Sequence, residues 1–169
     1  MTNRQKTLNK KLLAAALSSA KASDIHMLVR QGADINCANE WGLTPLMLAS
    51  QYNTHVMVLK AIIKDGADLC AVEPKYRSNA LHLAASKCSN PKVIRTLVEA
   101  GADINVRNYL GETPLIIAVM QNANTRIFSQ LIASGADIAV CDWQAHNVME
   151  YARREKRPYI ITMLKKMGL

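Results

Sequence analysis

The feature that most constrains this chain is an internal repeat of about 34 residues. The tripeptide Gly-Ala-Asp recurs at 32–34, 66–68, 101–103 and 135–137, with spacings of 34, 35 and 34. A second set of similar segments runs in the same register, at 44–49, 79–84, 113–118 and 147–152. A fixed period of this size is the signature of a protein built from stacked structural repeats.

Each unit reads as two short helices followed by a turn. Thr44 and Asn79 carry side-chain oxygens that can cap the first turn of a helix. Pro45 follows as a first helical residue, where a missing N–H costs nothing. Apolar residues at helical spacing over 56–63 mark a second helix. Glycines suited to a left-handed helix end lie just past the second helices, at Gly66, Gly101 and Gly135.

Projecting the period in both directions divides the chain into five helix pairs. Residues 11–16 fall on the first helix of the first unit, and about 157–167 on the last helix. The approximate units are 4–36, 37–70, 71–105, 106–139 and 140–169. One pair cannot bury its own apolar face, so neighbours must stack. With half of its residues hydrophobic, we expect one all-α domain over 1–169.

The N-terminal residues also resemble a secretion signal, with basic residues, an apolar stretch over 12–20 and the sequence Ala-Lys-Ala at 20–22. That stretch is short and is interrupted by Ser18 and Ser19, and the repeat register accounts for it better. No apolar run approaches 18 residues, so we expect no membrane span.

The repeated segments resemble the ankyrin repeat family, whose units carry the patterns G-x-T-P-L-H-L-A and G-A-D-(I/V)-N. Residues 42–49 and 111–118 match the first pattern closely, and residues 32–36 and 101–105 match the second in full. The resemblance covers nearly the whole chain. It implies an α-solenoid with short β-hairpin fingers, used for protein–protein recognition and without chemistry of its own.

Two fingers depart from this pattern. Arg77 and Ala145 stand where the other units have glycine, and a side chain resists the left-handed backbone. The hairpin shape of these two fingers is therefore open. One additional residue enters near 72–74, so we expect the third finger, around Pro74–Arg77, to be longer or bent.

In this family, partners meet the finger tips and the exposed side of each first helix, which together line a concave face. Carried over to this chain, the resemblance implies a set of contact residues, which we call the expected contact set. It comprises Glu40, Trp41, Leu43, Gln51, Tyr52, Lys75, Tyr76, Ser78, Ser86, Lys87, Arg107, Tyr109, Leu110, Glu112, Met120, Gln121, Trp143, Gln144, His146 and Arg154.

Five of the seven Trp and Tyr residues fall in the expected contact set: Trp41, Tyr52, Tyr76, Tyr109 and Trp143. Binding hot spots are enriched in such residues. The competing interpretation is that the rings pack against the next finger and stiffen it. We favour an aromatic row that grips a peptide or a partner's surface.

Net charge supports a second hypothesis. Residues 1–36 hold six Lys and Arg against two Asp, and residues 140–169 hold six against three acids, whereas the middle is nearly neutral. A nucleic-acid- or phosphate-binding protein would use these basic ends, and its affinity would fall steeply with salt. No basic stripe crosses the middle, so a protein partner remains our first expectation.

No catalytic, cofactor or metal site is expected. The four cysteines, at 37, 70, 88 and 141, form no C-x-x-C pair. His82 occupies the family's usual helix histidine, which is a structural hydrogen-bonding residue there. His26, His55 and His146 lie in different units without a carboxylate at useful spacing. We predict a protein that is not an enzyme.

The leading expectation is a monomeric adaptor, scaffold or inhibitor in a reducing, cytoplasmic compartment, where free thiols persist. A related hypothesis is a secreted effector resembling the ankyrin proteins of intracellular bacteria. The resemblance also places Asn36 and Asn105 where asparaginyl hydroxylases modify some eukaryotic members, whereas Cys70 and Ala139 replace asparagine elsewhere. Whether either asparagine is modified is open.

Overall fold

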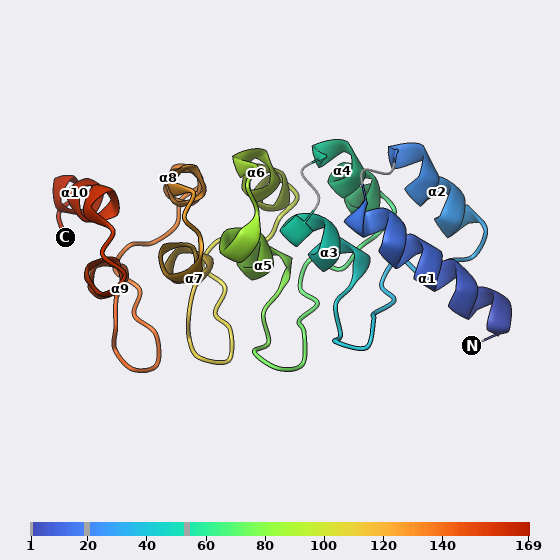
Figure 1. The fold of residues 1–169 in the computed structure, drawn as a ribbon, viewed down its shortest axis with the longest axis horizontal. Coiled ribbons are helices and arrows are strands. Elements are labelled where there is room, and N and C mark those ends of the chain that lie inside the picture. Colours follow the sequence, from blue (N-terminus) through green and yellow to red (C-terminus); the bar gives the residue numbers. More distant parts are fainter. Residues whose placement is uncertain (1, 19–20, 53–54) are drawn as a thin grey trace.

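The computed structural model describes residues 2–18, 21–52 and 55–169, which form a row of paired helices (Figure 1). The helices of this part of the chain are α1 (Asn3–Leu17), α2 (Ala22–Arg30), α3 (Pro45–Tyr52), α4 (Val56–Lys64), α5 (Ala80–Lys87), α6 (Pro91–Glu99), α7 (Pro114–Gln121), α8 (Thr125–Ala133), α9 (Val148–Arg154) and α10 (Pro158–Lys166). Each unit expected from the sequence contains one pair. The all-α solenoid of helix pairs is thus the observed fold.

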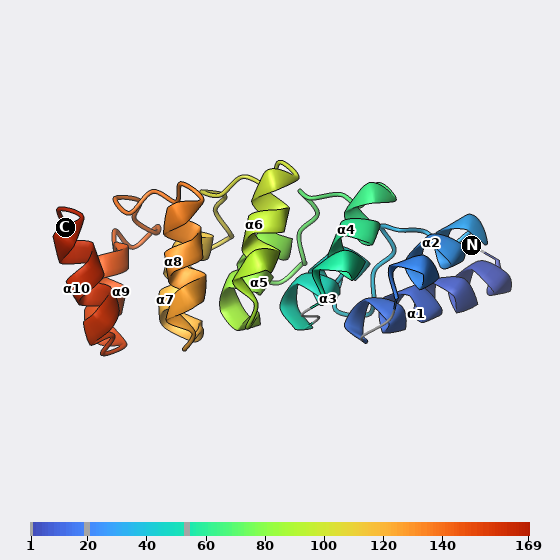
Figure 2. The same cartoon turned by 90° about the horizontal axis from the view of Figure 1, so that it is seen from above.

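The helices form two layers, and the fingers extend from one side (Figures 1 and 2). The first helices of the units, α1, α3, α5, α7 and α9, pack on one another in sequence. The second helices α2, α4, α6 and α8 do the same, and α10 packs on α9. Buried apolar residues from Leu8 to Leu164 form one core. Stacking of the units therefore buries the apolar face that a single helix pair would leave exposed.

Local sequence determines where the helices begin and end. The Thr44 hydroxyl accepts a hydrogen bond from the Met47 N–H at the start of α3, and the Thr113 hydroxyl accepts one from the Ile116 N–H at the start of α7. At the start of α5, the side chain of Asn79 accepts from two backbone N–H groups. The glycines that follow α4, α6 and α8 all have positive φ. The capping and glycine predictions are confirmed.

Residues 11–16 lie in α1, as the repeat register predicts, but this helix begins earlier than the pattern indicates. The Thr2 hydroxyl caps it by accepting from the Gln5 N–H. One turn further on, the Asn9 side chain accepts from the backbone N–H of Asp34 at 2.9 Å. These contacts extend α1 to Asn3. Ser19 and Ala20, part of the competing signal interpretation, lie outside the described residues.

The fingers span residues 39–43, 73–78, 108–112 and 142–146, and they are turns. The implied β-hairpins are not confirmed, because no strand is present in the ranges that the structure describes. Each finger is closed by one backbone bond from its first residue to its last, such as Asn108 N–H to Glu112 C=O at 3.1 Å. A single such bond makes a closed turn rather than a ladder.

The two fingers without glycine keep the same kind of turn. Arg77 and Ala145 take φ values of 54° and 63°, in the left-handed region that glycine occupies elsewhere. In the third finger the closing bond joins Glu73 to Ser78, five positions apart instead of four. The third finger is therefore one residue longer, as expected from the sequence.

Candidate partner-binding groove

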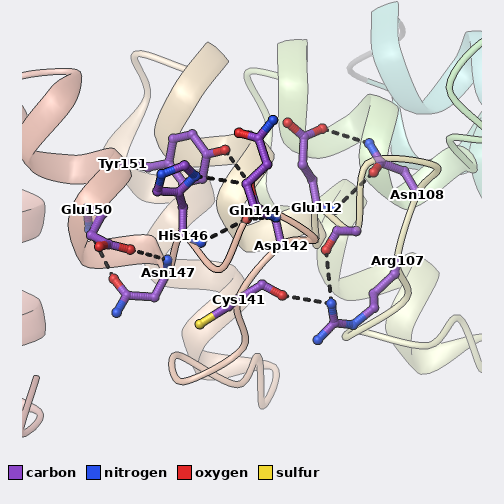
Figure 3. Close-up of polar contacts among 11 residues, drawn as sticks. Arg107, Asn108, Glu112, Cys141, Asp142, Gln144, His146, Asn147, Glu150 and Tyr151 are labelled. Atoms are coloured by element: carbon purple, nitrogen blue, oxygen red, sulfur yellow. Dashed lines mark hydrogen bonds and ion pairs between the residues drawn. The ribbon is translucent and has the colours of Figure 1, made fainter.

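One side chain at the base of each finger holds the shape of that finger. These equivalent residues are Asn39, Glu73, Asn108 and Asp142. Each accepts hydrogen bonds from backbone N–H groups of its own finger. Asp142 Oδ1, for example, accepts from Gln144 and His146, both at 2.9 Å (Figure 3). The side chain thus satisfies donors that a strand would otherwise pair.

The third finger shows why its base residue differs from the others. It is one residue longer, and a glutamate, which is one methylene longer than asparagine or aspartate, reaches across it. The Glu73 carboxylate accepts from the N–H groups of Lys75, Tyr76 and Ser78 at 2.7, 2.8 and 3.1 Å. The additional residue was predicted from the sequence, whereas this match in length was not, although the repeat period aligns all four positions.

In the fifth finger the base residue also reaches a helix. The Tyr151 hydroxyl on α9 donates to Asp142 Oδ2 at 2.6 Å (Figure 3). Burial alone would raise the pKa of Asp142, but the hydrogen bonds from Tyr151 and the finger backbone lower it below its usual value. Burial, together with this carboxylate, raises the pKa of Tyr151. The finger is thereby tied to its own unit.

Neighbouring fingers pack closely on one another. A Cβ added to Gly42 would lie 2.3 Å from the ring of Pro74, and one on Gly111 would lie 2.6 Å from the ring of Trp143. The Trp143 backbone N–H also donates to the Leu110 backbone carbonyl at 3.1 Å. These two glycines therefore allow the next finger to approach, in addition to permitting a positive φ.

A groove of about 740 Å³ lies between the second, third and fourth fingers and the first helices α3, α5 and α7. Fourteen of the twenty residues in the expected contact set line it. They are Glu40, Trp41, Leu43, Gln51, Tyr52, Lys75, Tyr76, Ser78, Ser86, Lys87, Leu110, Glu112, Met120 and Gln121. Residues separated by up to 81 positions are thus brought to one surface.

Six residues of the expected contact set lie outside this lining: Arg107, Tyr109, Trp143, Gln144, His146 and Arg154. The aromatic row is therefore divided. Trp41 and Tyr76 directly precede the positive-φ residue of their fingers and line the groove, whereas Tyr109 and Trp143 directly follow the base residue and do not. The Arg107 guanidinium stacks on Trp143, 4.6 Å from the ring centre, and donates to the Cys141 carbonyl at 2.7 Å.

The aromatic side chains of the groove are exposed despite their size. Trp41 is 66% exposed, Tyr52 51% and Tyr76 44%. Leu83 and Ile117 add apolar surface to the groove and were not predicted from the sequence. They lie one helical turn before predicted lining residues on α5 and α7, so helical spacing could have found them. The lining also includes Glu73, Pro74, His82 and Asn108.

Several polar lining residues are buried and hold neighbouring units together. The Ser86 hydroxyl donates to Gln121 Oε1 at 2.7 Å, which joins α5 to α7. His82 Nε2 lies 3.1 Å from the Glu112 carbonyl, and its Nδ1 lies 2.9 Å from Asn79 Oδ1. Burial lowers the pKa of His82, although the carbonyl contact opposes this effect. Gln51 and Ser78 are buried as well.

The expectation that the histidines lack a carboxylate at useful spacing is wrong for His26 and His146. His146 Nδ1 lies 3.7 Å from Oδ2 of Asp142, four residues earlier. His26 Nδ1 lies 2.8 Å from both carboxylate oxygens of Asp65, because the stacking of α2 on α4 brings these distant residues together. Among the described residues, no group of three or more His, Cys, Asp or Glu side chains is arranged to hold a metal ion. Within the same part of the chain, no helix has the length and apolar character needed to cross a membrane.

Two models of known families match the chain. One, described as ankyrin repeats in three copies, matches residues 12–108, and another, described as ankyrin repeats in many copies, matches residues 89–132. The chain belongs to the ankyrin repeat family. Ankyrin repeats are in general protein–protein interaction modules rather than enzymes.

This ankyrin repeat protein is similar to members from distant organisms. It is 34% identical over 138 residues to ankyrin repeat protein FPV031 of fowlpox virus. This match covers 80% of this chain and 40% of the viral protein. It is 31% identical over 104 residues to the Neurogenic locus Notch protein of Drosophila melanogaster, covering 53% of this chain and 4% of that protein. The B-cell lymphoma 3 protein homolog of Mus musculus is 33% identical over 107 residues. This match covers 63% of this chain and 23% of the mouse protein. The chain therefore spans less than half of each relative, and none of the three bears the name of an enzyme.

Proposed function

We propose that this ankyrin repeat protein is a non-enzymatic adaptor, scaffold or inhibitor whose groove holds a peptide or surface segment of a partner protein. The observation that carries the proposal is the convergence of Trp41, Tyr52 and Tyr76 on one groove with an apolar floor. Buried tryptophan and tyrosine anchors dominate the binding energy of many interfaces. A volume of about 740 Å³ is within the range of sites that enclose a ligand.

The rigid finger bases support the same proposal. A loop that is ordered before binding loses less conformational entropy when the complex forms. The base side chains of the second, third and fourth fingers fix the loops that carry Trp41, Tyr76 and Leu110. Trp41 and Tyr76 are thus presented on turns that are already closed, and Tyr52 is at the end of α3. We also propose that the protein works as a monomer in a reducing, cytoplasmic compartment, because all four cysteines are free thiols.

The basic residues outside the groove favour no second function. Those of α1 and those of α9 and α10 lie at opposite ends of the solenoid (Figure 1). A nucleic-acid strand would have to bridge the whole row of units to meet both sets. Binding of nucleic acid through these ends is therefore kept as an outcome of the test, and secretion as a bacterial effector stays a prediction.

A displayed library of random peptides tests the proposal. The library is selected on the immobilised parent chain and, in parallel, on the Trp41→Ala/Tyr76→Ala variant, with washes at low and at high salt. We expect peptides to be enriched on the parent at high salt and not on the variant, because the hot-spot rings are removed. Equal enrichment on both proteins would show that the groove is not the site. Nucleic acid that is retained by both proteins and released by salt would instead assign binding to the basic ends.

A further inference from the structure

The charged side chains that line the groove are divided by unit. Glu40 is in the second unit. The third unit carries Glu73, whose carboxylate accepts from three backbone N–H groups, and two exposed lysines, Lys75 and Lys87. In the fourth unit the lining residues are Asn108, Leu110, Glu112, Ile117, Met120 and Gln121. Glu112 is the charged member of that set. The fourth-unit end of the groove is therefore anionic within an otherwise neutral wall.

Glu112 is held firmly in place. It is 6% exposed, and its Oε2 accepts from the Asn108 side-chain amide at 2.8 Å (Figure 3). Its backbone N–H donates to Asn108 Oδ1 at 3.0 Å, and its backbone carbonyl oxygen lies 3.1 Å from His82 Nε2. The two ends of the fourth finger thus fix the carboxylate against the groove, with Oε2 occupied by an amide rather than by a cation.

Two cations of the third and fourth units, Lys75 and Arg107, make other contacts. None of the ion pairs formed among the described residues includes Glu112. Arg107, which directly precedes the same finger, donates to the Cys141 carbonyl (Figure 3). It also donates to the Gly111 carbonyl and stacks on Trp143. In the third unit, the Lys75 ammonium lies 4.8 Å from the centre of the Tyr76 ring.

A carboxylate this buried is ordinarily paired with a cation, because removing a charge from water is costly. Glu112 has a hydrogen bond from an amide but no ion pair among the described residues, which leaves this carboxylate available to a cation of a bound partner. Apolar Leu110, Ile117 and Met120 line the same end of the groove, so apolar residues of a bound segment can pack there while its cation pairs with Glu112 and offsets the cost of desolvation. The lysines of the third unit would disfavour a basic residue at that point and direct it towards the fourth.

From this placement, and resting on the proposed function, we infer that the groove takes an extended, apolar peptide segment carrying one arginine or lysine, whose cation pairs with Glu112. Stacked helices lie about 8–10 Å apart, so the groove extends over roughly 20 Å from the second unit to the fourth. An extended chain covers that distance with about six residues. The apolar residues would lie along Trp41, Tyr52 and Tyr76, and the basic residue beyond them.

The inference can be tested with three pools of capped eight-residue synthetic peptides. The pools share the same random mixture of Leu, Ile, Phe, Tyr, Ser and Gly, and they differ at one fixed internal position, which is Arg, Gln or Glu. Retention of each pool on the immobilised chain is quantified by mass spectrometry for the parent, for Glu112→Gln and for Glu99→Gln. The last is the matched control, because Glu99 is on α6, exposed, outside the groove and paired with Arg95.

We expect the parent to retain the Arg pool roughly 30-fold more strongly than the Gln pool, as for a close charge pair, and the Glu pool least. Glu112→Gln should abolish this preference and still retain the Gln pool, whereas Glu99→Gln should behave like the parent. The parent's preference needs no variant, so the basic residue can be refuted even if Glu112→Gln folds poorly, whereas the assignment to Glu112 is tested by the variant.

Other results would overturn the inference. Equal retention of the Arg and Gln pools on the parent, or a preference for the Glu pool, would refute the basic residue while leaving the groove as a peptide site. An Arg preference unchanged in Glu112→Gln would refute the assignment to Glu112. If the parent retained no pool, the inference and the proposed function would both fail.

Discussion

At the scale of single residues, the shape of each finger depends on one hydrogen-bond acceptor at its base. The length of that side chain matches the length of the finger. Asparagine or aspartate spans a five-residue finger, and glutamate spans the six-residue third finger. The sequence displays these four residues at one position of the period. Their role could not be predicted from the pattern, because a polar residue in a turn is compatible with many hydrogen-bond arrangements.

Replacing Glu73 by alanine should lower the free energy of unfolding by about 2 kcal/mol, because three backbone N–H groups lose their acceptor. Glu73→Asp should also destabilise the chain, since the shorter side chain cannot span the longer finger. Urea denaturation measures both changes. Glu155→Ala, at an exposed position beyond α9, serves as the control. A Glu73→Ala variant as stable as this control would contradict the assigned role.

His82 should make stability depend on pH. Burial lowers its pKa in the folded protein, so the unfolded chain binds a proton first as the pH falls. The contribution of the neutral ring is complete above the unfolded pKa of about 6.5 and is lost as the pH falls below it towards the folded pKa. Urea denaturation from neutral to mildly acidic pH should therefore show a steeper loss of stability for the parent than for His82→Gln. Parallel curves would be inconsistent with a buried, neutral histidine.

At the scale of elements, the helices were predictable and the fingers were not. Helix ends follow from local chemistry, such as the Thr113 cap and the glycines after the second helices, and the period repeats that chemistry. The packing at the finger glycines depends instead on the next finger. Pro74 covers Gly42 and Trp143 covers Gly111, whereas Ala145 is in the last finger. A motif within one unit carries no information on these contacts between units.

Two glycine variants separate backbone strain from packing between fingers. Gly101→Ala places a side chain at positive φ with no atom within 4 Å, and should cost about 1 kcal/mol of stability. Gly111→Ala has the same strain, and its Cβ would lie 2.6 Å from the Trp143 ring, so it should cost roughly 1–3 kcal/mol more. Thermal and urea unfolding of both variants provide the comparison. Equal losses would mean that the fourth and fifth fingers are not packed as described.

At the scale of the whole molecule, the groove exists only because units stack. Family resemblance treats every unit alike, so it placed contact residues such as His146 and Arg154 in the fifth unit. The groove covers the second, third and fourth units, and its lining ends at Gln121. The aromatic row is divided because its members occupy different positions within their fingers. Trp41 directly precedes the positive-φ residue of its finger, whereas Tyr109 directly follows the base residue. The five-unit fold followed from the period, whereas the extent of the site required the assembled solenoid.

The most direct test of the central claim is calorimetric titration of one peptide enriched on the parent chain. The dissociation constant is measured with the parent, with Trp41→Ala/Tyr76→Ala and with Tyr109→Ala/Tyr159→Ala, which removes two exposed rings outside the groove. We predict that the groove variant binds about 30-fold more weakly or worse, that the control matches the parent, and that high salt changes neither result. Equal affinity of all three proteins would contradict the claim that the groove is the binding site.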